Sequence, residues 1–272
     1  MVVFIGNHLV FNENLKLLCL NQYKRRFIMK NKLLIKITIT LCFFLSCSKI
    51  MASAYWIDVK GSGKVNEPLN IELCYGSMDE YGVRHRDSGK ELQLAGDFQI
   101  RIIDAKGNEQ KLELILQKDS WLAVFIPKNE GQYRIVGIND KHPVVDRSAT
   151  GGENVLPIDY IAAVYNVNTS IITKSNPIQK VDIITVSDNK KIIVKAFFDG
   201  KPSKAGTKIR VFNPENWEKE LILNKDGEAV FYPTMKGLYI IRQDWVEPVS
   251  GAYKNVNYTS KRHRCNYYLL YQ

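Results

Sequence analysis

The sequence predicts an all-β protein of two tandem Ig-like antiparallel β-sandwich domains behind a cleavable export signal. Residues 123–127 and 229–233 read Ala-Val-Phe-Ile-Pro and Ala-Val-Phe-Tyr-Pro, and each segment leads after three residues to a glycine and a second apolar run. Alternating side chains indicate a strand, proline ends it for lack of an N–H, and glycine lets the chain bend into the next strand. Because the copies lie 106 residues apart, we expect two similar units with separate cores.

A tyrosine stands two residues after the glycine of each copy, at Tyr133 and Tyr239. This placement resembles the tyrosine corner of Greek-key sandwiches, in which the ring is buried and the hydroxyl bonds to the backbone. A buried tyrosine with a bonded hydroxyl packs the core, whereas a binding role would need an exposed ring. We therefore expect both rings to lie in the cores.

Residues 1–54 form the predicted leader. Within a signal peptide at 29–54, a basic start precedes an apolar run at 37–45 and a small-residue cleavage site at 52–54. Because a bacterial signal normally begins at the initiator, the sequence indicates that residues 1–28 result from a misplaced start. A genuine N-terminal extension is the alternative.

A second cleavage pattern overlaps the first. Residues 44–48, Phe-Leu-Ser-Cys-Ser, resemble a lipoprotein box, in which Cys47 would carry a lipid anchor. Cleavage at 52–54 would instead release a soluble chain. Both routes predict export to the periplasm or outer membrane, and the apolar run is well below the roughly 20 residues that a membrane-spanning helix needs.

The basic character of the chain belongs mostly to this leader. The whole chain has 38 Lys and Arg against 28 Asp and Glu, a net charge of +10. Residues 1–54 hold eight of the basic residues and one of the acidic ones, which leaves the remainder near +3. A body so close to neutral lacks the basic footprint of a nucleic-acid-binding protein, so we expect no nucleic acid partner.

The first β-sandwich is predicted at residues 55–168, where short apolar runs alternate with polar turns. Two stretches in this range, 76–96 and 139–154, are polar and are expected to be loops. The strands are expected at 55–60, 69–75, 98–104, 110–117, 121–126, 133–138 and 158–167.

A linker is predicted at 169–177, which is rich in Ser, Thr and Asn, and the second β-sandwich follows at 178–272. About 100 residues are enough for an independent core. Asp-Gly turns at 199–200 and 226–227 separate several of the expected strands. These strands lie at 178–186, 191–198, 207–212, 219–223, 228–232, 238–244, 251–258 and 262–271.

Several local motifs occur in a recognisable order. An aromatic-Trp-Ile strand at 55–57 follows the signal, Asp-Gly-Lys-Pro stands at 199–202, an Asp-Gly turn precedes the corner at 231–239, and Arg-His-Arg at 262–264 opens the last strand. This order resembles the NikM-like periplasmic family, which is named for its likeness to a nickel-transport component. Membership would imply an exported β-sandwich protein, associated with metal uptake and without an established catalytic activity.

Four residues after the leader are candidate ligands for a divalent transition metal. Strand alternation places His263 and Cys265 on one face, and imidazole with thiolate suits soft divalent ions. His85 and His142 are expected in loops. The alternative is that His263 and Cys265 fill the core face of the last strand. Cys74 is the other cysteine of this part of the chain. It lies in the first predicted unit and Cys265 in the last strand of the second, so we do not expect a disulfide between them.

No catalytic motif is present, whether metalloprotease, nucleophile elbow, phosphate loop or Cys-x-x-Cys, so the sequence predicts a protein that is not an enzyme. We expect an exported binding or accessory protein associated with nickel or cobalt uptake, with membrane transport or outer-membrane receptor proteins as partners. The alternative is an adhesion or glycan-binding module that uses exposed rings, with Trp121, Trp217 and Trp245 as the candidates.

Overall fold

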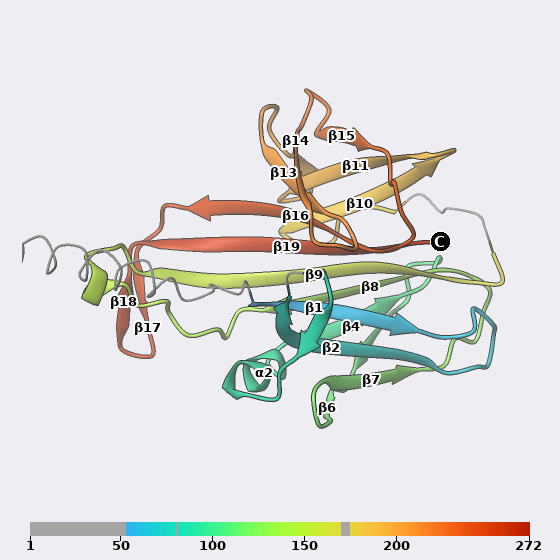
Figure 1. The fold of residues 1–272 in the computed structure, drawn as a ribbon, viewed down its shortest axis with the longest axis horizontal. Helices are drawn as coiled ribbons and strands as arrows, with labels where there is room; N and C mark the ends of the chain where they lie inside the picture. Colours follow the sequence, from blue (N-terminus) through green and yellow to red (C-terminus); the bar gives the residue numbers. More distant parts are fainter. Residues whose placement is uncertain (1–52, 80, 170–174) are drawn as a thin grey trace, which may run out of the picture. The chain divides into compact units, whose positions relative to one another are not determined.

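The computed structural model describes residues 53–79, 81–169 and 175–272. The regular secondary structure of this part of the chain is nearly all β-strand, which confirms the predicted class (Figure 1). The leader predictions, including the lipid anchor at Cys47, lie outside the described residues apart from Ser53 and Ala54. No helix of the described residues is long and apolar enough to cross a membrane.

A single eight-stranded sheet, here named the central sheet, runs through the molecule in the order β14-β13-β16-β19-β9-β8-β4-β5. Its long strands provide the length over which side chains alternate between two buried faces. Its strands are β4 (Gln99–Ile103), β5 (Glu109–Leu112), β8 (Gly131–Asn139), β9 (Val155–Val167), β13 (Lys208–Phe212), β14 (Glu218–Ile222), β16 (Gly237–Glu247) and β19 (Ser260–Tyr271).

The two predicted sandwiches meet at the centre of this sheet. Strand β9, from before the predicted linker, pairs with β19, the last strand of the chain, over a register from Val155↔Ser260 to Ala163↔Tyr268. This pairing is parallel, whereas the other pairings in the sheet are antiparallel. Four strands from each side of the linker therefore share one hydrogen-bonded ladder.

Two smaller sheets complete the sandwiches. The first small sheet has the order β1-β2-β7-β6, with β3 paired to β2, and the second has the order β10-β11-β12, with β15 paired to β11. The strands of the first are β1 (Ser53–Lys60), β2 (Leu69–Met78), β3 (Arg84–Arg86), β6 (Ile115–Leu116) and β7 (Trp121–Phe125), and those of the second are β10 (Val181–Asp188), β11 (Lys191–Phe198), β12 (Lys201–Pro202) and β15 (Glu228–Phe231).

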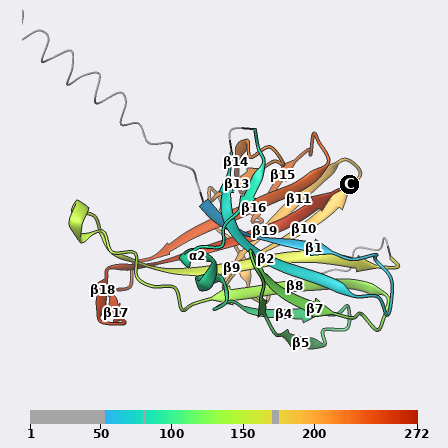
Figure 2. The same cartoon turned by 60° about the horizontal axis from the view of Figure 1, so that its bottom comes forward.

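The small sheets cover opposite faces of the central sheet. Along β9, Ile161 and Ala163 belong to the core under the first small sheet, while Tyr160 and Ala162 belong to the core under the second. Figure 1 shows β10 and β11 on one side of β9 and β19, with β1 and β2 on the other, and in Figure 2, where the bottom of that view is turned forward, β1 and β2 are drawn across β9. Two cores thus exist, as the repeat predicts, and they are divided by the alternation of shared strands.

The repeated corners take the predicted form. Tyr133 is 3% exposed and donates its hydroxyl hydrogen to the Asn129 carbonyl at 2.8 Å. Tyr239 is 2% exposed and donates to the Met235 carbonyl at 3.1 Å. Both hydroxyls also accept backbone N–H groups from the same bends. The prediction that these rings are core residues is confirmed.

Several segments differ in detail from the expected strands and loops. The expected strand 110–117 divides into β5 and β6, which pair with different sheets because the chain crosses from one layer to the other between them. The expected loop 76–96 contains β3 and the helix α2 (Lys90–Ala95), whose Leu92 and Ala95 lie on one face and enter the core. Residues 251–258 form a hairpin of β17 (Gly251–Tyr253) and β18 (Val256–Tyr258), and a 3₁₀ turn lies at Ser148–Thr150.

Candidate functional site

His263 and Cys265 lie on the same face of β19, as the alternation predicts, and both are buried. The Nδ1 atom of His263 is 3.0 Å from the hydroxyl oxygen of Tyr160, and its Nε2 atom is 3.1 Å from a carboxylate oxygen of Glu247. The ring also packs against Trp245, with the centroids 5.3 Å apart. Both ring nitrogens are therefore engaged within the protein.

Burial sets the ionisation of these side chains. Desolvation lowers the pKa of His263, opposed by the hydrogen bond to Glu247. Desolvation also raises the pKa of the Cys265 thiol well above its ordinary value. Metals bind the thiolate and not the thiol. A protonated Cys265 in an apolar core is thus chemically a packing residue.

The other two predicted histidine ligands lie elsewhere: His85 is exposed and His142 is half-buried. His85 is on β3, where its Nε2 is 2.8 Å from an Asp79 carboxylate oxygen. His142 lies in the loop after β8, with Nδ1 3.1 Å from the Pro143 carbonyl oxygen. Among the described residues, the one group of three His, Cys, Asp or Glu donors within 4.8 Å of one another contains none of the four predicted ligands. The structure brings His263 and Cys265 to one face and places His85 and His142 apart from them.

That group of three is Asp58, Glu72 and Cys74, which lie on one face of β1 and β2. The guanidinium of Arg86 already bridges the two carboxylates, at 2.8 Å from Asp58 and 2.6 Å from Glu72. Burial, followed by the charge of Asp58, raises the pKa of Cys74 to about 12. The carboxylates are thus neutralised by a guanidinium and the thiol stays protonated. Both Cys74 and Cys265 are free, and they lie in different cores.

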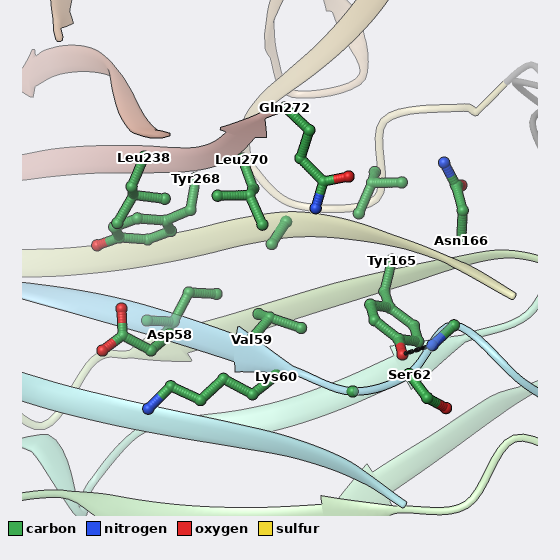
Figure 3. A pocket seen from close by; sticks show the side chains of 15 residues that line it. Asp58, Val59, Lys60, Ser62, Tyr165, Asn166, Leu238, Tyr268, Leu270 and Gln272 are labelled. Carbon is green, nitrogen blue, oxygen red and sulfur yellow. Dashed lines mark hydrogen bonds between the residues drawn. The ribbon is translucent and has the colours of Figure 1, made fainter. Parts of the chain in front are cut away.

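A groove of about 490 Å³ runs beside β1, between that strand and the ends of β9, β16 and β19 (Figure 3). We name it the β1 groove. At one end the Tyr165 hydroxyl accepts a hydrogen bond from the backbone N–H of Gly63 at 2.6 Å. Leu238 and Leu270 form an apolar part of the wall, and Asp58 and Lys60 are its charged residues. The remaining lining is Ile57, Val59, Gly61, Ser62, Gly63, Ala163, Val164, Asn166, Tyr268 and Gln272.

Strand β1 is the edge of the first small sheet and pairs with β2 alone. The Tyr55 carbonyl accepts a hydrogen bond from the Tyr268 hydroxyl at 2.8 Å, so it points away from β2. In an antiparallel pair, alternate residues share this direction. The backbone N–H and C=O groups of Ile57 and Val59 consequently point away from β2, toward the groove that these residues line. Sequence reasoning did not identify this edge, because no local pattern marks which strand of a sheet is last.

The three candidate tryptophans have different environments. Trp121 is half-buried and donates its ring N–H to the Leu92 carbonyl, and Trp245 is half-buried against Phe198 and His263. Trp217 is 74% exposed. Exposed stacking surface is thus present at one of the three.

Comparisons with known proteins give distant structural similarities and no family. No family model matches the chain, and no curated protein sequence matches it. A two-domain fibronectin type III segment from chicken tenascin is similar over 80% of this chain and 99% of its own length, with 8% identity and a TM-score of 0.23. Dimeric latent PorU from Porphyromonas gingivalis is similar over 81% of this chain and 20% of its own length, with 11% identity and a TM-score of 0.21.

Proposed function

We propose that this chain is an exported, non-enzymatic accessory protein that binds an extended segment of a partner protein along β1. The observation that supports this function is the unpaired β1 edge, which lies beside a groove of about 490 Å³. An exposed edge strand presents a row of free N–H and C=O groups, and an extended peptide can add to it as a further strand.

The walls of the groove indicate the kind of segment that fits. Main-chain hydrogen bonds to Ile57 and Val59 would supply affinity without regard to sequence. Leu238 and Leu270 would contact every second side chain of the added strand, because side chains alternate along it. Such a segment is extended and has apolar residues at alternate positions.

Substituting Val59 with proline tests this function directly. Proline lacks the N–H that faces the groove, whereas the pairing of β1 with β2 does not use that group. We expect Val59→Pro to abolish co-sedimentation of the purified chain with cell-envelope membranes, while the matched control Val59→Ala still sediments. Equal sedimentation of both variants would exclude the β1 edge as the binding surface. Failure of the unchanged chain to sediment would count against an envelope partner altogether.

The resemblance to the NikM-like family supports a partner from a transition-metal uptake system, either a membrane transport protein or an outer-membrane receptor. The engaged nitrogens of His263 favour an accessory role over direct metal capture. Calorimetry with nickel, cobalt, copper and zinc separates the two. A metal that binds with a dissociation constant below about millimolar, and that no longer binds to His263→Ala, would establish metal capture. If no metal binds, the accessory role is retained.

A second candidate, glycan or surface adhesion, is favoured by two exposed rings on neighbouring hairpin tips. Tyr81 is 81% exposed and Trp217 is 74% exposed. A Cβ added at Gly82 would lie 2.9 Å from the Cα of Glu215, so the two tips touch. If the chain binds glycans on an array and Trp217→Ala abolishes this binding, the result would support the function. If the unchanged chain binds no glycan on the array, the function is rejected.

A further inference from the structure

A second, smaller cavity lies where the first small sheet meets the far part of the central sheet. Its volume is about 110 Å³, and it shares no lining residue with the β1 groove. Three of its lining residues are arginines, Arg84, Arg242 and Arg264, and none is acidic. We name it the arginine pocket. Its other lining residues are Ala54, Trp56, Gly76, Ser77, Met78, Phe212, Asn216 and Ile240.

Both Arg-His-Arg motifs of the sequence contribute an arginine here. Arg84 comes from the motif on β3 and Arg264 from the motif on β19, while Arg242 lies on β16 beside Asn266. The chain thus brings together charges from strands far apart in sequence. In each motif one of the two arginines lines the pocket, and the histidine does not.

Two guanidinium nitrogens at this pocket are buried without a hydrogen bond. Within the part of the chain that the structure describes, four buried side-chain nitrogen or oxygen atoms lack a partner, and two of them are an Nη of Arg84 and the Nε of Arg264. Guanidinium N–H groups are strong donors, and leaving them desolvated and unbonded is costly. An acceptor that enters the pocket would remove this cost.

Arg86, on the same strand as Arg84, has a guanidinium that is paired with carboxylates. Arg86 bonds to Asp58 and Glu72 and lies 3.4 Å from Asp119. The side chain of Arg84, two residues earlier, forms no hydrogen bond or ion pair with any described residue and instead lies over the Trp56 ring at 5.7 Å. The two arginines share one face of β3, so the difference lies in what surrounds each head group.

Carboxylates near the pocket are too few for its arginines. Asp244 is shared among Arg210 and Arg262, at 2.8 and 2.9 Å, and Arg264, at 3.5 Å, and Asp159 lies 3.9 Å from Arg264. Arg242 donates to the neutral amide oxygen of Asn266 at 2.7 Å. Burial, together with the charge of Arg264, lowers the pKa of Arg242 to about 10. Positive charge is therefore in excess on this side of the central sheet.

We propose that the arginine pocket binds a tetrahedral oxyanion, either as a free ion or as the phosphate or sulfate group of a ligand. Guanidinium forks match the oxygens of such anions. Three arginines approach from three strands, and the four oxygens of a tetrahedral group point in different directions toward them, whereas both oxygens of a carboxylate lie in one plane. The apolar walls formed by Trp56, Phe212 and Ile240 strengthen these contacts by excluding water.

Calorimetry of the full chain with inorganic phosphate and with sulfate tests the site, with acetate and chloride at matched ionic strength as comparison ions. We expect phosphate and sulfate to bind and to raise the thermal midpoint more than acetate or chloride does. Arg84→Gln should weaken binding by about tenfold or more, because it removes a charged donor. Arg84→Lys should lie in between, because it keeps the charge and loses the fork.

The controls make the outcome decisive. The Arg84 side chain has no hydrogen-bond or ion-pair partner among the described residues, so Arg84→Gln should leave the midpoint without added anion unchanged or raise it. Arg101→Gln removes an arginine that pairs with Glu109 outside the pocket and should leave anion binding unchanged. Equal responses of the Arg84→Gln, Arg101→Gln and unchanged chains to phosphate would overturn the proposal, as would equal binding of acetate and phosphate.

Discussion

At the scale of single residues, burial and not sequence motif determines the chemistry of the histidines. His263 is 1% exposed, in contact with Tyr160 and Glu247. A neutral ring with the hydrogen on Nε2 can donate to Glu247 while Nδ1 accepts from the Tyr160 hydroxyl. Hydrogen bonds from His263 and Lys180 lower the pKa of Glu247, so this carboxylate is charged near neutral pH.

This environment predicts a pH dependence of stability. The pKa of His263 is lower in the folded chain than in the unfolded chain, where it is about 6.5. As pH falls below that value, the unfolded state binds protons that the folded state does not, so the free energy of unfolding should fall. Between about pH 7.5 and about pH 5.5, we expect the free energy of unfolding to fall less in His263→Gln than in the unchanged chain. Denaturant titrations at several pH values measure both slopes, and identical slopes would contradict the assignment.

At the scale of elements, the two corners share backbone geometry but differ in their surroundings. Gly131 has φ of 131° and Gly237 has φ of 133°, a region that residues with a side chain rarely adopt. A Cβ at Gly237 would lie 2.8 Å from Pro214, whereas one at Gly131 would lie 3.3 Å from the methyl of Ala105. The second corner is therefore the tighter of the two.

Alanine at each corner should reveal this difference. Both Gly131→Ala and Gly237→Ala incur backbone strain of roughly 1–3 kcal/mol. We expect Gly237→Ala to lower the free energy of unfolding by the larger amount, because the added methyl also meets the Pro214 ring. Chemical denaturation measures both, and a larger loss at Gly131 would refute the packing argument.

At the scale of the whole molecule, a buried ion pair joins the two halves. Arg134 on β8 pairs with Asp182 on β10, and both side chains are almost completely buried. Asp182 also accepts the backbone N–H groups of Ile178 and Gln179, and Arg134 donates to the Asn176 carbonyl. This pair thus attaches the described end of the predicted linker, residues 175–177, and the start of β10 to the central sheet.

Removing one partner should destabilise the chain as a whole. Asp182→Ala leaves the Arg134 charge buried and unpaired, which costs about 3–5 kcal/mol. Because β9 and β19 share a ladder, we expect one cooperative unfolding transition at a lower denaturant midpoint. The control Glu109→Ala breaks the half-exposed pair with Arg101 and should change stability by at most about 1 kcal/mol. Two separate transitions in the unchanged chain would contradict this coupling.

The sequence by itself determined the features that depend on local periodicity. Strand alternation placed His263 and Cys265 on one face, and the spacing of Pro, Gly and Tyr predicted the corners with Tyr133 and Tyr239 in the cores. These features depend on neighbours a few residues apart, and backbone geometry relates such neighbours in a fixed way. The all-β class followed from the same local patterns.

Only the tertiary structure decided which distant strands pair. The parallel pairing of Tyr160 with Cys265 joins residues more than 100 positions apart, and neither segment carries a local mark of its partner. That pairing joins one layer of each sandwich into the central sheet. The strand order of the first small sheet leaves β1 at its edge. The tertiary structure also brings Arg84 and Arg264 to one pocket. The physical reason is that the pairing of distant strands depends on how whole faces of the sheets pack against each other. Every strand of a layer contributes to that packing, so no single segment determines its own partner.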